Sequence, residues 1–231
     1  ATFGNVYRKE KICSLRLCMP RRMLVAMQME EFMTRRYELR FNRMKECKEY
    51  RERHSLFMDY RPVTTEAVKS ICFEVQLEGI SAIEYDVQRY VDSRRISHYW
   101  PVEEYLFDLP NWDGQDRIRA LADCVPCENK EWKDFFYIWF LSMVAHWLQM
   151  DREHANSTSP LLVGPQGCRK STFCQNLLPP ELRPYYVDGI DLGSRKDAEM
   201  ALNRFALINL DEFDSIPASR QPYLKNLLQK A

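Results

Sequence analysis

The chain has 231 residues, of which 45% are hydrophobic and 29% charged, and its formal net charge is zero. This length provides for one large or two modest domains with a proper core. The eight cysteines show no disulfide framework and no secretory signal precedes them, which excludes a disulfide-stabilised secreted scaffold and favours a reducing, cytoplasmic location.

Charge is unevenly distributed along the sequence. Residues 1–60 carry 14 Lys and Arg against 8 Asp and Glu, a net charge of +6, which leaves −6 for residues 61–231. A basic N-terminal region suits a polyanionic partner, but Arg-rich helix faces are often only solvated. Both interpretations stay open for this region.

The first 155 residues are expected to be mainly helical. A long helix opens at Pro20, and the alternation at 37–41, followed by a charged stretch to Arg53, predicts a β-hairpin. Further helices are expected at about 65–77, from Ser81 to Val91, at 103–107, around Ile118 and Leu121, and at 132–150. The last of these is strongly apolar but contains Lys133 and Asp134, so we expect a buried helix and no membrane association.

Two short motifs in this region admit more than one explanation. The Trp-Asp-Gly sequence at 112–114 is expected to form a turn, with Trp112 packed in a helical domain and Asp113 capping the next helix, rather than a direct ligand contact. Arg117 could pair with Asp113 or reach a nucleotide. The Cys124–Cys127 pair has metal-ligand spacing without a second pair nearby, so we expect a loop with two thiols rather than a zinc site.

The segment that follows has the pattern of a phosphate-binding loop. The apolar run 161–163 ends at Gly164, and Lys170 and Ser171 follow at the spacing of G-x-x-x-x-G-K-[ST]. Glycines let backbone N–H groups turn inward around an anion, while Lys170 would reach the outer phosphates and Ser171 would bind Mg²⁺. The predicted nucleotide-binding residues are Gly164, Pro165, Gln166, Gly167, Cys168, Arg169, Lys170, Ser171 and Thr172.

Arg169 stands where this pattern expects its second glycine. As a bystander, its guanidinium would lie in solvent. As a participant, it would add a second cation against the phosphates, which its planar, bidentate geometry suits. Both roles stay open on the sequence.

A second motif makes the nucleotide interpretation firmer. Residues 205–210 are mostly apolar and end in Asp211 and Glu212, as expected for a buried strand that delivers carboxylates to the carboxyl edge of a parallel sheet. Asp211 would hold Mg²⁺ beside Ser171, and Glu212 would orient or deprotonate the attacking water. Lys170 and Glu212 are therefore the predicted catalytic residues of an enzyme that uses ATP and Mg²⁺.

Alternating elements surround both motifs. Strands are expected at 161–163, 185–187 and 205–210, and helices at 170–178, 195–204 and 218–230. This order predicts an α/β fold with a parallel, helix-covered sheet, here the first half of a P-loop domain at 156–231. A basic region at 1–60 and a helical domain at 61–155 would precede it, with the polar stretch Asp151–Ser159 as the junction.

Several stretches resemble the virulence-associated E (VirE) family. They are Pro101-Val-Glu-Glu-Tyr-Leu, Leu109-Pro-Asn-Trp-Asp-Gly-Gln-Asp-Arg-Ile, the helix containing Trp139, and Leu162-Val-Gly-Pro-Gln-Gly-Cys-Arg-Lys-Ser-Thr-Phe. The resemblance implies a superfamily 3-like or AAA+-like ATPase, related to phage and plasmid primase-helicases, that acts on single-stranded nucleic acid as a ring. By the same resemblance, the sequence would end before the sensor residue and arginine finger that such enzymes use.

The resulting hypothesis is an ATP-dependent helicase or primase-associated ATPase of a mobile genetic element. Its expected partners are single-stranded DNA or RNA, further copies in a ring formed by the longer protein, and a primase domain or protein. Two alternatives remain open: a small-molecule or nucleotide kinase, and a non-catalytic nucleic-acid-binding module with a degenerate P-loop. The first residue is Ala1 rather than Met, which indicates a processed or excised fragment.

Overall fold

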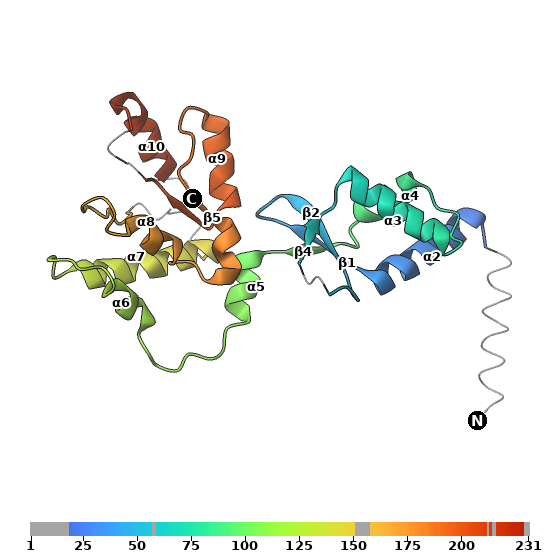
Figure 1. Ribbon diagram of the computed structural model, residues 1–231, viewed down its shortest axis with the longest axis horizontal. Helices are drawn as coiled ribbons and strands as arrows, with labels where there is room; N and C mark the ends of the chain where they lie inside the picture. The colour runs from blue at the N-terminus through green and yellow to red at the C-terminus, as the bar shows by residue number, and fades with distance from the viewer. Residues whose placement is uncertain (1–18, 57–58, 151–157, 212, 214–215, 229–231) are drawn as a thin grey trace. The chain divides into compact units, whose positions relative to one another are not determined.

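The computed structural model describes residues 19–56, 59–150, 158–211, 213 and 216–228. The chain divides into two compact units, Ala1–Tyr99 and Trp100–Ala231 (Figure 1). Within the described residues, no helix is long and apolar enough to cross a membrane.

Within the described residues, the first unit combines three helices with a four-stranded sheet. Its elements are α2 (Arg21–Arg36), β1 (Tyr37–Asn42), β2 (Cys47–Glu52), β3 (Arg61–Pro62), α3 (Thr65–Leu77), α4 (Glu84–Val91) and β4 (Ser97–Tyr99). The sheet order is β3-β2-β1-β4, with β1 antiparallel to β2 and parallel to β4. The helix after Pro20, the hairpin and the helix at 65–77 are thus confirmed. Strand β4 was not predicted, because three residues are too few to show a period.

One face of this sheet carries the core of the first unit. Tyr37 and the partly buried Leu39 pack with Phe32, Ile71 and Val87 of the three helices. These residues recur at helical and strand spacings, so their burial follows directly from the sequence pattern.

The opposite face of the sheet is polar and internally paired. The guanidinium of Arg40 lies 3.6 Å from the ring centroids of both Tyr60 and Tyr99, and it bonds Glu49 at 2.8 Å. Only 2% of Glu49 is exposed. A carboxylate this buried is tolerated because a cation neutralises it and donates hydrogen bonds to it.

The second unit contains short helices around a small parallel sheet. Its elements are α5 (Pro101–Phe107), α6 (Arg117–Ala122), α7 (Trp132–Trp147), α8 (Lys170–Gln175), η1 (Pro180–Tyr185), β5 (Tyr186–Asp188), α9 (Arg195–Arg204), β6 (Leu207–Asn209), η3 (Ala218–Arg220) and α10 (Gln221–Leu228). Strands β5 and β6 are parallel, with Tyr186 opposite Leu207 and Asp188 opposite Asn209. The α/β class is therefore confirmed.

The division into units differs from the predicted boundaries near 60 and 155. Residues 61–99 supply α3, α4 and two strands to the first unit. Helix α7 instead packs on the segment that contains the phosphate loop, since Phe136 clusters with Phe173, Leu177 and Leu207. These contacts bury large aromatic rings, so they override the composition change on which the predicted boundary depended. The predicted junction lies mostly outside the described residues, at 151–157.

The strand predicted at 161–163 does not form. In the part of the chain that the structure describes, the second unit has one sheet of two strands, β5 and β6. Leu161 is 65% exposed and Val163 88% exposed. An apolar run becomes a buried strand only where neighbours cover it and pair its backbone, and the sequence pattern does not report those neighbours.

Candidate functional site

The phosphate-loop pattern folds into a tight turn that leads into α8. Gly167 has φ 81° and Arg169 has φ 64° and ψ 30°, so both residues are left-handed. Glycine adopts this conformation freely, whereas a residue with a Cβ is disfavoured there by roughly 1–2 kcal/mol. Left-handed residues in such turns direct neighbouring N–H groups to one side, which favours an anion. Arg169 therefore takes the glycine conformation that the pattern requires, at an energetic cost.

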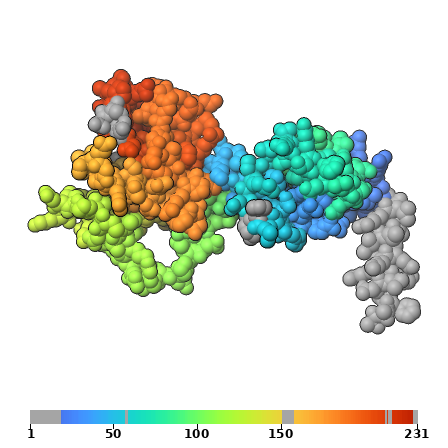
Figure 2. All heavy atoms as spheres, viewed as in Figure 1, coloured from blue at the N-terminus to red at the C-terminus, as the bar shows by residue number. Residues whose placement is uncertain are grey.

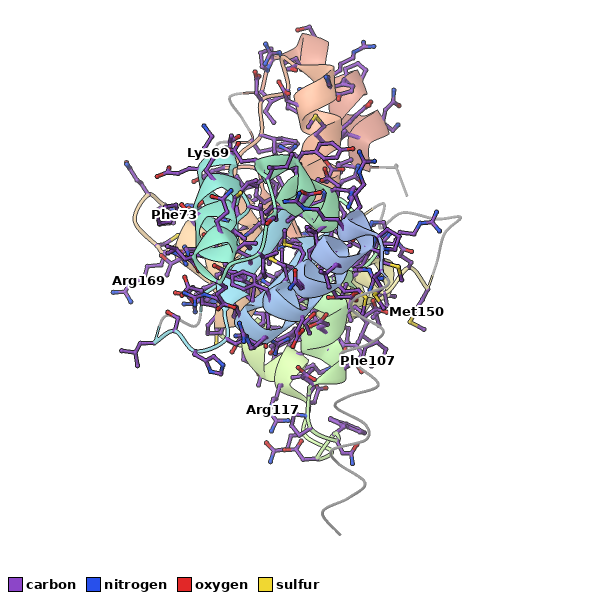
Figure 3. The ribbon with its side chains drawn as sticks, turned by 90° about the vertical axis from the view of Figure 1, so that its right-hand side faces the viewer. Lys69, Phe73, Phe107, Arg117, Met150 and Arg169 are labelled. Atoms are coloured by element: carbon purple, nitrogen blue, oxygen red, sulfur yellow. The ribbon has the colours of Figure 1, made fainter. Side chains whose placement is uncertain are left out.

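The side chain of Arg169 is exposed and extends away from the ribbon in Figure 3. This direction fits the bystander role more closely than direct contact with a phosphate in the same loop. Pro165, Gln166 and Thr172 are also exposed.

Lys170 closes the loop from inside. Its Nζ donates to the carbonyl oxygens of Gly164 at 2.9 Å and Pro165 at 3.0 Å, and it lies 3.6 Å from Sγ of Cys168. These bonds join the first residue of the α8 helix to the start of the pattern. The ammonium group is therefore positioned beside the backbone that would surround a phosphate.

The two sequence motifs meet at Ser171 and Asp211. Oγ of Ser171 donates to Oδ2 of Asp211 at 3.0 Å, across 40 residues of sequence. Oxygen atoms are the ligands that Mg²⁺ prefers, and the Ser171 hydroxyl follows directly after Lys170. Glu212, the predicted water-orienting residue, lies outside the described residues.

The oxygen atoms of Ser171 and Asp211 are suitable ligands for Mg²⁺. Among the residues that the structure describes, no three His, Cys, Asp or Glu side chains are gathered in a group that could hold a metal ion by themselves. Mg²⁺ is commonly held by one or two carboxylates together with substrate phosphates and water. One carboxylate and one hydroxyl beside a phosphate loop match that description.

Sequence reasoning missed Asp188 and Asn209 at the ends of β5 and β6. Oδ1 of Asp188 accepts hydrogen bonds from the Tyr186 hydroxyl and from Nδ2 of Asn209, the latter at 2.9 Å. Burial, and then the bond to Asp188, raise the pKa of Tyr186. The available signal was that each strand ends in a polar residue, but the sequence did not show that the two ends are adjacent.

The Trp-Asp-Gly turn has a different structure from the predicted one. Trp112 is 79% exposed rather than packed, and its Nε1 donates to the Gln115 carbonyl at 3.1 Å. Asp113 does not cap α6: Asp116 does so, accepting from Arg119 N at 3.0 Å. In Figure 2, the segment between α5 and α6 projects from the second unit as a narrow arm. Most of the indole surface therefore lies in solvent.

Asp113 instead pairs with Arg117, which answers the question that the sequence left open. The two guanidinium nitrogens of Arg117 bond Oδ1 and Oδ2 of Asp113 at 2.7 and 2.5 Å. Hydrogen bonds from Arg117 hold the pKa of the Asp113 carboxyl well below its usual range. This pair braces the turn rather than contacting the phosphate loop.

Comparison with known families places part of the chain in a described family. The model of the virulence-associated protein E-like domain matches residues 106–231, which is more than half of the chain and includes the loop predicted to bind phosphate, β5 and β6. No curated protein matches the sequence.

Proposed function

The chain belongs to the virulence-associated protein E-like family, which fits a protein associated with mobile genetic elements. We propose that it is an ATPase of such an element. It would bind ATP at the loop 164–172 and act on single-stranded nucleic acid, as a helicase or a primase-associated motor. It would assemble with further copies of itself as a ring.

The observation that carries this proposal is the contact of Ser171 with Asp211 beside the loop-bound Lys170. A chance glycine-containing turn gives no reason for a hydroxyl after the lysine to meet the carboxylate at the end of a distant strand. A nucleotide site requires this meeting, since the hydroxyl and the carboxylate serve the same ion.

The chain's own residues have separate tasks in this proposal. Lys170 exchanges its neutral carbonyl partners for charged phosphate oxygens, which are stronger hydrogen-bond acceptors. Ser171 and Asp211 would hold Mg²⁺, which when bound neutralises charge on the phosphates. Glu212 is proposed to orient the attacking water, and the backbone of 164–169 surrounds the phosphates.

A non-catalytic nucleic-acid-binding module is the second candidate. Arg169 in the glycine position and the irregular backbone at 161–163, where a strand was expected, favour it, because both depart from a regular P-loop. This candidate predicts salt-dependent binding to single strands without affinity for nucleotide.

Substitution of Lys170 separates the two candidates. Lys170→Ala is expected to weaken binding of a fluorescent ATP analogue in Mg²⁺ by at least about tenfold, a loss of about 1.4 kcal/mol. The same variant should abolish any ATP hydrolysis stimulated by single-stranded DNA. Lys196→Ala, which removes an exposed lysine from α9, is the matched control and should bind as the wild type does. Equal binding by the wild type and Lys170→Ala would show that the loop is not a nucleotide site.

A further inference from the structure

The carboxyl edge of the β5–β6 sheet carries polar side chains that belong to neither of the two sequence motifs. In the parallel ladder, Asp188 pairs with Asn209, so the two strands end at the same edge. Asp211 follows Asn209 by two residues. Side chains two residues apart in a strand share a face, and Asn209 bonds Asp188 across the strands. Tyr186, Asp188 and Asn209 therefore lie on one face of the sheet.

Helix α8 lies on that same face. Ser171 bonds Asp211, and Cys174, one turn further along α8, is half-buried. Burial raises the pKa of the Cys174 thiol, and the negative charges of Asp188 and Asp211 raise it further. Phe173 of α8 clusters with Leu207, which lies two residues before Asn209 on the same face of β6, so α8 and Asp188 are on the same side of the sheet.

The two oxygens of Asp188 differ in their surroundings. Both hydrogen bonds to this carboxylate, from Tyr186 and from Asn209, end on Oδ1. Two donors on one oxygen fix the plane of the group. Oδ2 accepts no hydrogen bond from the described residues, and the residue is exposed. Asp188 therefore presents one fixed oxygen and one that is open to a ligand.

We propose that Asp188 is a positioning residue of the same site, and that its Oδ2 holds a water molecule bound to the Mg²⁺ of Ser171 and Asp211. This role rests on the proposed function. Mg²⁺ gives up its waters reluctantly and usually keeps several of them when it binds a protein and phosphates. A carboxylate one strand away from the metal ligand suits such a water, because it accepts the water's hydrogen bond and orients the hydration shell.

A purely structural role for Asp188 makes a different prediction. Asp188 would then serve only to join β5 to β6 through Oδ1. Substitution with Asn separates the two roles, because it changes only the atom at the Oδ2 position. The amide oxygen can keep both bonds at the Oδ1 position, which leaves the NH₂ group, a donor, where Oδ2 had been an acceptor.

The test is a titration of Mg²⁺ against binding of a fluorescent ATP analogue to the full chain. Asp188→Asn is expected to raise the Mg²⁺ concentration for half-maximal binding about tenfold, or about 1.4 kcal/mol. Affinity measured in EDTA should stay unchanged, as should the melting temperature. Asp188→Glu, which restores an acceptor, should recover part of the loss. Asp191→Asn is the matched control, because it removes the same charge three residues away, and it should behave as the wild type.

The outcomes distinguish the two proposals. A wild-type Mg²⁺ requirement in Asp188→Asn, with Lys170→Ala impaired, overturns the role of Asp188 and leaves the nucleotide site standing. Equal nucleotide binding by the wild type and Lys170→Ala overturns both. Should Asp188→Asn fail to fold, Tyr186→Phe gives the answer, because it loosens the carboxylate and keeps its charge. A raised Mg²⁺ requirement in Tyr186→Phe supports the proposal, and an unchanged one overturns it.

Discussion

The polar sheet face of the first unit and the phosphate loop of the second use charge in opposite ways. In the first unit, Arg40 is held between two tyrosine rings and neutralises the buried Glu49. In the second, Lys170 bonds only backbone carbonyls and a thiol, and no carboxylate of the described residues pairs with it. Compensated charges maintain a fold, whereas an uncompensated cation beside a turn of left-handed residues is available to an anion.

The same contrast bears on the basic N-terminal region. Arg51 and Arg53 both pair with Glu38, so they are committed within the unit, as Arg40 is. The excess positive charge of residues 1–60 is therefore partly structural, and a polyanion would have to compete with these pairs.

Among the charge substitutions, the largest expected effect comes from breaking the compensated pair. Glu49→Gln should destabilise the protein by about 3 kcal/mol, because it leaves the Arg40 cation without its counter-charge in a buried position. Urea denaturation measures this loss, and Mg²⁺-dependent nucleotide affinity should not change. Glu52→Gln, at an exposed pair with Arg61, should cost less than about 1 kcal/mol. Similar losses for both variants would contradict the contrast between the two units.

A smaller change in stability, and a gain rather than a loss, is expected from a substitution in the loop 164–172. Arg169→Gly should stabilise the protein by up to about 1 kcal/mol, because glycine adopts the left-handed conformation without a Cβ penalty but loses more backbone entropy. Thermal unfolding measures this gain. Nucleotide affinity should be unchanged or tighter, since the Arg169 side chain extends into solvent. Gly167→Ala, at φ 81°, is the matched control and should lose stability. A clear loss of affinity in Arg169→Gly would restore the participant role of the guanidinium.

The smallest effect is expected at the exposed turn. Trp112→Ala should leave the melting temperature unchanged, because most of the indole surface is already in water. Phe136→Ala, by contrast, removes a ring that is 1% exposed and should cost about 3–5 kcal/mol. Differential scanning calorimetry of Trp112→Ala and Phe136→Ala measures both changes in melting temperature. A destabilised Trp112→Ala would mean that the indole packs against apolar surface in solution.

Local features of this protein could be predicted from the sequence. The helices at 65–77 and 195–204 and the β1–β2 hairpin follow from periodicity and turn residues, which act over a few positions. The spacing from Gly164 to Ser171 correctly indicated a turn before a helix. The capping role of Asp113 was wrong because Asp116, three residues later, competes for the same helix start.

Features that depend on distant residues could not be predicted in the same way. Nothing in the residue pattern indicated that β4 would pair with β1, or that α7 would pack on Phe173. The absent strand at 161–163 has the same origin, since a strand exists only together with its hydrogen-bonding neighbours. Glu212 stays a prediction, as it lies outside the described residues.

By itself, the sequence determined which residues of the two motifs carry the proposed nucleotide chemistry: a lysine and a hydroxyl at a fixed distance from a glycine, and a carboxylate after an apolar run. Only the tertiary structure decided which of them meet. It brought Ser171 to Asp211 and placed Asp188 on the same sheet face, and it left Lys170 without a counter-ion among the described residues. The physical reason is range: backbone preferences act over a few neighbouring residues, whereas hydrogen bonds and burial between distant segments are fixed only when the chain packs.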